Sequence, residues 1–456
     1  MTPLPRGTRI VLDPSVRHGR GGTLTGGWPR RVMRLSPAGQ RALQDLQRGD
    51  ATSDTALELG RRLVNAAMAH PRPAPRDCDC DVTVVVPVRD RPLQLERCLG
   101  ALGAGTAVIV VDDGSRDHRT VAATAARHAA RLVRRQASGG PAAARNAALP
   151  LVGTEFVAFL DSDCVAPRTW LRVLLGHFDD PLVAAAAPRV RPHSLPSGGL
   201  IARYLATRCP LDMGASEARV LPGGAVPYVP TAALVVRRST LGEGFDDGLR
   251  VGEDVDLVWR LHDAGYQVRY DPSVQIEHSE PATLGRLLAR RFRYGTAAAS
   301  LEARHPRRVR HLAVRPWPAI AALSLLLRRP GVAAVIAAQQ SALISRRLRN
   351  VGPNAQGVRW FTEAMLDAVV SVGRYVATLW LPVAIIVLSR RSRLTGLGLL
   401  LMPVLYEWLL SETDLDLLRW TALVLADDAA YGAGVWSGCV KARRFGSLMP
   451  AINSRR

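Results

Sequence analysis

Three short apolar segments each run directly into carboxylates, and this repetition constrains the fold of the 456-residue chain more than any other feature. The segments and the acids that follow them are residues 82–88 with Asp90, residues 107–111 with Asp112 and Asp113, and residues 155–160 with Asp161 and Asp163. Continuous apolar runs of this length are typical of buried parallel strands, and the intervals between them suit helices. Because ligands of such sheets bind beyond the carboxyl ends of the strands, the pattern predicts a doubly wound, nucleotide-binding α/β sheet with acids along one edge.

The Asp161-Ser162-Asp163 motif indicates a metal site at that edge. A hard divalent cation prefers oxygen ligands and often keeps substrate phosphates among them. Taken alone, an Asp-x-Asp motif is more often a solvated turn. The metal-site interpretation rests on its position directly after a predicted buried strand.

Two later segments begin helices with charged residues. Gly139-Gly140 forms a turn before a helix that carries Arg145, and both a helix N-terminus and an arginine suit a diphosphate. An ordinary join between loop and helix is an equal alternative. Glu253 and Asp254 open a second helix, where acids also complement the helix dipole, and Asp254 is the natural general base for an acceptor hydroxyl.

The ordered motifs VVVPVRDR, VVDDGS, GGPAAARNAAL, FLDSD, GEDVDLVWRLHDAGY and EH closely resemble the inverting glycosyltransferases of family two. The resemblance implies the GT-A fold, a nucleoside-diphosphate sugar donor such as a UDP-sugar, and Mg²⁺ or Mn²⁺. It further implies a direct displacement that inverts the anomeric carbon.

The resemblance also assigns expected roles. Asp254 is implied as the catalytic base, with Glu253 beside it. Asp161 is implied in both the ribose contact and the metal shell, Asp163 as a metal ligand, and His278 as a further ligand, although a lone histidine is more often a simple hydrogen-bonding residue. The residues implied in nucleotide-sugar binding are Pro87, Val88, Asp90, Asp112 (against the uracil), Asp113, Arg145 and Asp161.

The sequence Arg290-Arg291-Phe292-Arg293-Tyr294 is similar to the Gln-x-x-Arg-Trp signature of processive family members. It implies acceptor binding by Arg290, Arg293 and Tyr294, since a pyranose stacks well on an aromatic face. A basic helix stripe that meets lipid or diphosphate is the alternative.

Residues 1–70 are expected to form a winged-helix-like α+β domain. Short strands are predicted at 9–12, 23–25 and 32–35, a helix after the Ser36-Pro37 cap, and a second helix that ends at His70-Pro71. This domain resembles peptide clamps that recognise precursor peptides. Together with the motifs RYGT at 293–296 and AYGAGVW at 430–436, it makes the chain similar to the glycosyltransferases of the mycofactocin system. That resemblance implies a β-1,4-glucose chain built on a peptide-derived redox cofactor; a purely structural extension is the alternative for the domain.

Charge and hydropathy suggest a membrane surface as a further partner. The net charge of +21 favours anionic partners, but the basic residues form no nucleic-acid-binding module. Residues 375–389 and 394–406 are apolar but short for membrane spans, so helices that pack on the enzyme or lie at an anionic membrane are favoured over one or two C-terminal spans. No signal peptide is expected, and scattered cysteines indicate a reducing compartment. We therefore expect a peripheral protein on the cytoplasmic side of the membrane.

The predicted organisation is a clamp domain at 1–70, a linker at 71–80, a GT-A domain at 81–300 and a helical apolar region at 301–456. The expected function is metal-dependent glucosyl transfer from UDP-glucose to a mycofactocin-type acceptor. The alternatives are a membrane polysaccharide or glycolipid glycosyltransferase and an inactive sugar-nucleotide or peptide-binding scaffold. The clustered acids argue against the scaffold, because keeping several carboxylates together is costly without a function.

Overall fold

The computed structural model describes residues 2–77, 81–103, 105–193, 198–348, 356–381 and 393–452. Two compact units are present. One comprises Met1–Arg17, Leu24–Leu195 and Arg208–Glu280, and the other comprises His18–Thr23, Pro196–Thr207 and Pro281–Arg456.

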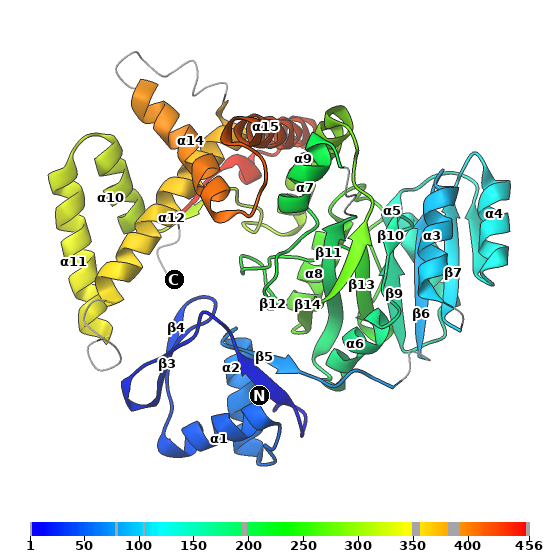
Figure 1. The fold of residues 1–456 in the computed structure, drawn as a ribbon, viewed down its shortest axis with the longest axis horizontal. Coiled ribbons are helices and arrows are strands. Elements are labelled where there is room, and N and C mark those ends of the chain that lie inside the picture. The colour runs from blue at the N-terminus through cyan, green and yellow to red at the C-terminus, as the bar shows by residue number, and fades with distance from the viewer. Residues whose placement is uncertain are drawn as a thin grey trace. The chain divides into compact units, whose positions relative to one another are not determined.

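The first unit is built on a nine-stranded sheet (Figure 1). Its strands are β6 (Val82–Val88), β7 (Ala107–Asp113), β8 (Arg131–Arg135), β9 (Phe156–Leu160), β10 (Cys164–Val165), β11 (Val183–Pro192), β12 (Ala218–Val220), β13 (Ala233–Arg237) and β14 (Gln267–His278). The order is β10-β14-β11-β13-β9-β6-β7-β8, with β12 beside β14. Strands β6 to β9 pair in parallel, whereas β13 runs antiparallel to both β9 and β11. The three predicted apolar strands are confirmed, and the predicted α/β sheet of the GT-A type is present.

Helices cover both faces of this sheet, as a doubly wound fold requires. They are α3 (Pro92–Leu102), α4 (His118–Arg127), α5 (Pro141–Ala148), α6 (Trp170–Gly176) and α8 (Glu253–Asp263). One hydrophobic core joins α3, α4 and α6 to alternate residues of the strands, among them Val84, Val86 and Ala158. Helix α5 contacts β6 and β7, and α8 contacts β14.

The N-terminal module has its own hydrophobic core. Its elements are β1 (Arg9–Leu12), β2 (Arg17–His18), β3 (Thr23–Gly26), β4 (Arg31–Arg34), α1 (Pro37–Arg48), α2 (Asp54–Asn65) and β5 (Ala69–Arg72). Ser36 caps α1 by accepting a hydrogen bond from the backbone N–H of Gly39 at 3.1 Å, which confirms the predicted helix start. The predicted end of the second helix is wrong: α2 stops at Asn65, and His70-Pro71 lies in β5, which pairs with β1. Residues 71 and 72 therefore belong to a strand of the module and not to a linker.

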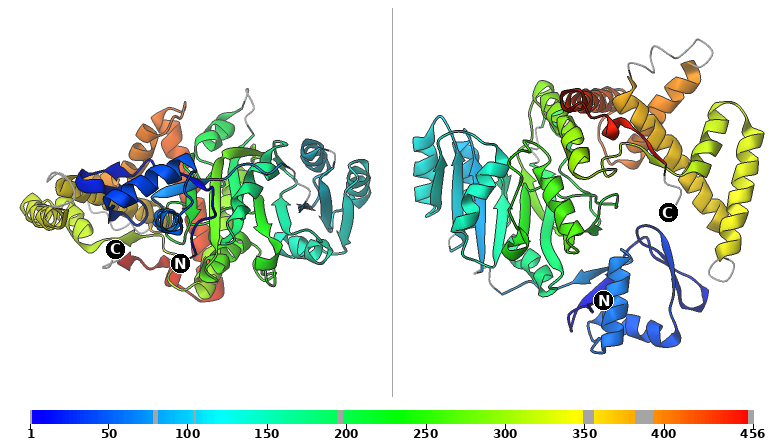
Figure 2. Two further views of the ribbon diagram at one scale, coloured as in Figure 1. Left: turned by 90° about the horizontal axis from the view of Figure 1, so that it is seen from below. Right: turned by 180° about the vertical axis from the view of Figure 1, so that it is seen from behind.

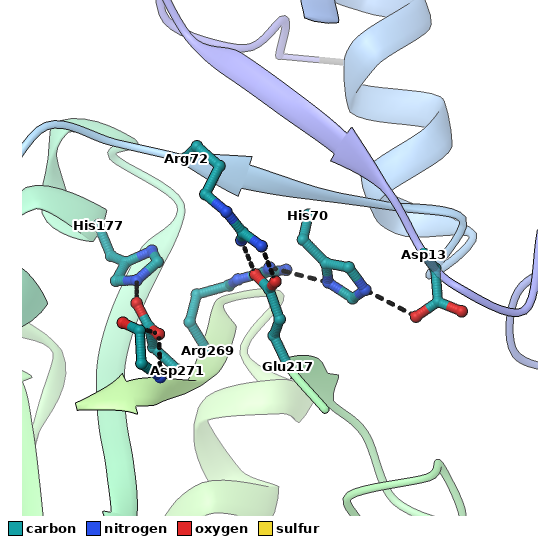
Figure 3. A network of polar contacts seen from close by, with 8 residues as sticks. Asp13, His70, Arg72, His177, Glu217, Arg269 and Asp271 are labelled. Carbon is teal, nitrogen blue, oxygen red and sulfur yellow. Dashed lines mark hydrogen bonds and ion pairs between the residues drawn. The ribbon is translucent and has the colours of Figure 1, made fainter. Parts of the chain in front are cut away.

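Ion pairs fasten this module to the amino-terminal end of the sheet. Both guanidinium nitrogens of the fully buried Arg61 bind Asp180, at 2.7 and 2.8 Å. Figure 3 shows the neighbouring network, in which Arg72 pairs with Glu217 and His70 lies between Asp13 and Arg269.

Strand β14 connects this junction to the opposite edge of the sheet. Its first residue, Gln267, donates to Asn65 of the module at 3.0 Å, and its last residue is His278. Nine residues of β14 pair with β11, while residues 272–274 bulge out of the ladder, so the strand spans roughly 26 Å. The module is therefore attached at the end of the sheet remote from the predicted acids.

The second unit is helical. Its elements are α7 (Leu200–Thr207), α9 (Leu284–Arg304), β15 (Ala313–Val314), α10 (Pro316–Leu326), α11 (Pro330–Leu348), α12 (Gln356–Leu379), α14 (Arg393–Leu410), α15 (Leu417–Ala442) and β16 (Ala451–Ile452). The RRFRYGT and AYGAGVW motifs lie on α9 and α15 and pack against each other. Helix α9 runs through residue 300, so the boundary predicted at that residue falls within a helix.

Glycines let α9 and α15 approach closely. A Cβ added to Gly295 would lie 2.2 Å from the carbonyl oxygen of Tyr431, and one added to Gly434 would lie 2.0 Å from that of Phe292. The two helices thus touch through their backbones, and a side chain at either glycine would push them apart.

Gly295→Ala is expected to lower the free energy of unfolding by about 1–3 kcal/mol, because the added methyl overpacks this contact. Gly398→Ala is the matched control, since nothing lies within 4 Å of its added Cβ. That substitution should instead stabilise α14 by up to about 1 kcal/mol. Denaturant unfolding followed by circular dichroism measures both, and equal stabilities would contradict the close packing of α9 on α15.

The apolar stretch predicted at 375–389 lies only in part within the described residues, at the end of α12, and Arg390 to Ser392 lie outside them. The stretch at 394–406 is the first part of α14. Among the helices that the structure describes, none combines the length and the apolar character needed to cross a membrane.

Candidate active site

Acids gather at the carboxyl ends of β6, β7 and β9, as the sequence predicts, because these neighbouring strands run in parallel. Pro87 and Val88 close β6, and the exposed Asp90 follows them with a left-handed backbone, φ 54°. The Asp90 carboxylate accepts the backbone N–H of Arg116 at 2.7 Å, and its own N–H donates to Ser115. The ends of β6 and β7 are therefore joined across the edge.

The two carboxylates that end β7 differ in their surroundings. Asp112 is 0 % exposed, and its Oδ1 accepts the backbone N–H of Ser115 at 2.8 Å. Its Oδ2 is buried without a hydrogen-bond partner among the described residues. Asp113 accepts hydrogen bonds on both oxygens, from Arg135, Ser138 and the N–H groups of Gly139 and Gly140.

Asp113 therefore fixes the turn that opens α5. Burial would raise its pKa, but these hydrogen bonds outweigh burial and lower the pKa below its ordinary value. The turn also needs glycine at Gly140, whose φ is 93°.

Arg145 on α5 joins acids from two separate elements. Only 2 % exposed, it donates to Asp161 after β9 at 2.7 Å and to Glu253 at the start of α8 at 2.9 Å. Burial would lower the pKa of Arg145, but the two carboxylates raise it above its ordinary value. The guanidinium predicted to bind diphosphate is thus already engaged in holding the site together.

Asp254 is the site acid whose titration is best suited to proton transfer. It lies in the first turn of α8, and its Oδ1 accepts the backbone N–H of Val255 at 2.8 Å. Burial and the neighbouring Glu253 carboxylate raise the pKa of Asp254 to about 7. A half-buried carboxylate with a pKa near neutrality can accept a proton and release it again.

Asp163 directly precedes β10 and His278 ends β14, and the pairing of these two strands brings the two side chains together. His278 Nε2 lies 3.4 Å from Asp163 Oδ1, and His278 Nδ1 lies 2.8 Å from Glu280. Arg91 pairs with the other oxygen of Asp163. Burial opposes both charges, but the hydrogen bonds between the groups raise the pKa of His278 and lower that of Asp163.

This arrangement fits a divalent cation. Ligand histidines commonly have one ring nitrogen held by a carboxylate while the other faces the ion, and Glu280 and Asp163 flank His278 in this way. Arg91 occupies one oxygen of Asp163, and the arginine side chain is half exposed.

Cys164 lies close enough to Asp163 and His278 to complete a group of possible ligands. Its thiol donates to the carbonyl of Ala232 at 3.4 Å, and burial raises its pKa well above the ordinary value, so it remains protonated. Asp161, which the sequence also places in the metal shell, accepts a hydrogen bond from Arg145 on Oδ1.

The residues predicted to bind the acceptor lie on α9 of the helical unit. Arg290 is buried, with its guanidinium 5.9 Å from the ring centroid of Tyr294, and Arg293 is exposed. Between them Arg291 forms an ion pair with the buried Asp427 at 2.6 Å, which attaches α9 to α15.

Sequence reasoning missed Arg91 and Glu280. Arg91 lies inside the VRDR motif, one residue beyond Asp90, and Glu280 lies two residues beyond His278. Their nearness to motif residues was the available signal, but only the folded chain shows that Arg91 pairs with Asp163 and Glu280 with His278.

The chain is similar in sequence to several known proteins. The sequence profile of Glycosyl transferase family 2 matches residues 83–242. The pre-mycofactocin glycosyltransferase of Mycobacterium tuberculosis is 38% identical over 478 residues, which covers 99% of this chain and 99% of that protein. The poly-beta-1,6-N-acetyl-D-glucosamine synthase of Staphylococcus aureus is 25% identical over 193 residues, 41% of this chain and 46% of that protein.

Among solved structures, a mannosyltransferase from Pyrobaculum calidifontis in complex with GDP-Man and Mn²⁺ matches with a TM-score of 0.40 and 20% identity, over 74% of this chain and 89% of that chain. The match to the mycobacterial relative extends from one end of the chain to the other. The chain therefore belongs to glycosyl transferase family 2, a family of inverting hexosyltransferases, and within it to the family of the pre-mycofactocin glycosyltransferase.

Proposed function

We propose that the protein transfers glucose from UDP-glucose to a mycofactocin-type acceptor, a peptide-derived redox cofactor, and extends it as a β-1,4-glucan chain. The end-to-end similarity to the pre-mycofactocin glycosyltransferase supports this acceptor. The single structural observation that carries the chemistry is Asp254, a carboxylate with a pKa of about 7, next to the Asp161-Arg145-Glu253 bridge.

In the proposed reaction, Asp254 takes the proton of the acceptor hydroxyl. The oxygen attacks the anomeric carbon from the face opposite the diphosphate, so a new carbon–oxygen bond forms as the bond to phosphate breaks and UDP leaves. This single displacement inverts the anomeric carbon. Arg145 holds the Glu253 carboxylate beside Asp254. The negative charge of Glu253 raises the affinity of Asp254 for the proton.

Asp163 and His278 would hold Mg²⁺ or Mn²⁺, with Glu280 orienting the imidazole. When bound, the cation neutralises negative charge on the diphosphate. The proposed contacts to the nucleotide sugar are those of Pro87, Val88, Asp90, Asp112, Asp113, Arg145 and Asp161, with the uracil against Asp112. The proposed contacts to the acceptor sugar are Arg290, Arg293 and Tyr294.

Mass spectrometry of a mycofactocin-type acceptor incubated with UDP-glucose and Mn²⁺ tests the proposal. We expect successive additions of one hexose mass, and products that a β-1,4-specific glucanase shortens. If the acceptor is unmodified while UDP-glucose still binds in calorimetry, the acceptor is wrong and a polysaccharide or glycolipid becomes the favoured substrate. If UDP-glucose does not bind, the donor is wrong.

Glu280→Gln is expected to raise the Mn²⁺ concentration for half-maximal transfer about 10–100-fold, because the amide holds the His278 imidazole less well. Removal of metal with EDTA should abolish transfer by the unmodified protein, and added Mn²⁺ or Mg²⁺ should restore it. Glu277→Gln, next to His278 in β14, is the matched control and should leave the metal dependence unchanged. Transfer that persists in EDTA would contradict the metal requirement.

Two further features complete the proposal. The N-terminal module docks the acceptor or its peptide precursor, supported by its attachment to the catalytic sheet through Arg61 and Arg72. The protein works at the cytoplasmic side of the membrane as a peripheral protein, supported by its net charge of +21.

A further inference from the structure

Helices α10 and α11 expose many large apolar side chains to water. They lie side by side, as both figures of the whole chain show (Figures 1 and 2). Their shared core with α12 is small: it contains Ala321 of α10 and Ile336 of α11, and Ala333 of α11 is also buried. The large apolar residues face outward: Trp317, Ile320, Leu323, Leu325, Leu327, Val332, Val335 and Leu343.

The outward residues are most exposed around the turn between the two helices. Leu327 is 62 % exposed and Val335 is 67 % exposed. A helix that is apolar on every side is normally buried, either in a protein core or in lipid. Small residues between helices and large ones outside are typical of helix pairs in membranes.

The one side-chain hydroxyl of α10 needs no water for its hydrogen bond. Ser324 is buried, and its hydroxyl donates to the carbonyl of Ile320 at 2.8 Å, within its own helix. Such bonding satisfies a hydroxyl inside an apolar helix. The pair can therefore enter an apolar medium without leaving this group unpaired.

Charge indicates which apolar surface covers these residues. Residues 303–362 contain eleven arginines and no Asp or Glu. Two of them, Arg328 and Arg329, form the turn itself and are exposed between Leu327 and Val332. An arginine can lay its apolar stem along lipid chains while its guanidinium binds a phosphate.

We propose that the turn between α10 and α11, residues 323–335, inserts into the surface of an anionic lipid bilayer. The outward leucines and valines enter the acyl boundary, and Arg328 and Arg329 bind lipid phosphates. Helix α10 is only about 16 Å long, so it enters one leaflet and does not cross the roughly 30 Å hydrocarbon core. A second copy of this chain is disfavoured as the partner of this surface, because both copies carry the same positive charge and repel each other. The inference rests on the proposed peripheral location, for which it names the membrane-binding element.

Sedimentation of the full chain with phosphatidylcholine vesicles, with and without phosphatidylglycerol, tests the inference. The unmodified protein should bind the anionic vesicles more tightly, and added salt should weaken this binding. Leu323→Glu with Leu327→Glu should reduce the vesicle partition coefficient about tenfold or more. Arg328→Gln with Arg329→Gln should reduce it less and remove much of the preference for phosphatidylglycerol.

Matched controls separate this site from general effects of charge. Leu93→Glu changes a leucine that is 78 % exposed on α3, and Arg41→Gln with Arg48→Gln removes two exposed arginines of α1. Both controls should bind vesicles like the unmodified protein, and all variants should keep its circular dichroism spectrum.

Two other results would overturn the inference, and they can be told apart. If Leu323→Glu with Leu327→Glu binds normally, the membrane contact lies elsewhere while the peripheral location stands. If the unmodified protein binds no vesicles, both fail, and self-association that the same variant abolishes would identify a second copy as the cover.

Discussion

Asp254→Asn is expected to lower kcat about 10³-fold, because the amide cannot take the proton of the acceptor hydroxyl. Asparagine is close to aspartate in size and can still accept the hydrogen bond of Val255 N–H, so α8 should keep its start. Binding of UDP-glucose, measured by calorimetry, should change little, which separates loss of the base from loss of the site. Initial rates of hexose addition measure the effect.

Asp256→Asn is the matched control on the same helix. Asp256 is buried and pairs with Arg260 at 2.8 Å, and it belongs to no part of the proposed site. This substitution should leave kcat within about threefold of the unmodified protein, because it weakens an ion pair within α8 and leaves the proposed base in place. If Asp254→Asn retained most of the activity, Asp254 would not be the base.

The pH dependence follows from the same carboxylate. Because the base must be ionised and its pKa is about 7, kcat/KM should fall as pH decreases below 7. Glu253→Gln removes a neighbouring negative charge that favours the protonated form, so the same fall should move to lower pH. An acid limb that stays in place in Glu253→Gln would show that another group controls it.

Arg61→Met is expected to destabilise the first unit by about 3–5 kcal/mol, since it leaves the carboxylate of Asp180 without its charged partner in a buried setting. Arg61 also donates to the carbonyls of Thr2 and Pro3, so the start of the chain loses its attachment in the same step. Denaturant unfolding and limited proteolysis near residue 2 should report both losses.

The exposed pair of Arg76 and Asp179, 3.3 Å apart, provides the comparison. Arg76→Met should cost only about 0–1 kcal/mol, because solvent screens a surface pair. Adding Asp180→Leu to Arg61→Met should recover part of the loss by removing the unpaired charge. Equal effects of Arg61→Met and Arg76→Met would contradict a buried junction between module and sheet.

The sequence predicted those parts of the site that depend on local pattern. Apolar runs define β6, β7 and β9, and parallel pairing then places Asp112 and Asp161 at one edge. The start of α8 was likewise predictable, because a glycine followed by two acids is typical of a helix N-terminus. In the structure Gly252 is the N-cap, with a left-handed backbone of φ 86°.

Contacts between distant segments could not be predicted in this way. No local pattern shows that Arg145 would span Asp161 and Glu253, which lie on different elements, or that Arg61 would meet Asp180 across 119 positions of sequence. Strand β5 was missed because His70-Pro71 is an ordinary helix stop, and only its pairing with β1 makes it a strand.

The length of β14 sets a spatial requirement on any acceptor that the module holds. The junction with the module lies at Gln267 and the histidine of the site at His278, roughly 26 Å away along the strand. An extended peptide needs about eight residues to cover that distance. A precursor anchored on the module would thus reach the His278 end of the site only through a spacer of at least this length, and shorter precursors would have to be released from the module before they are glycosylated.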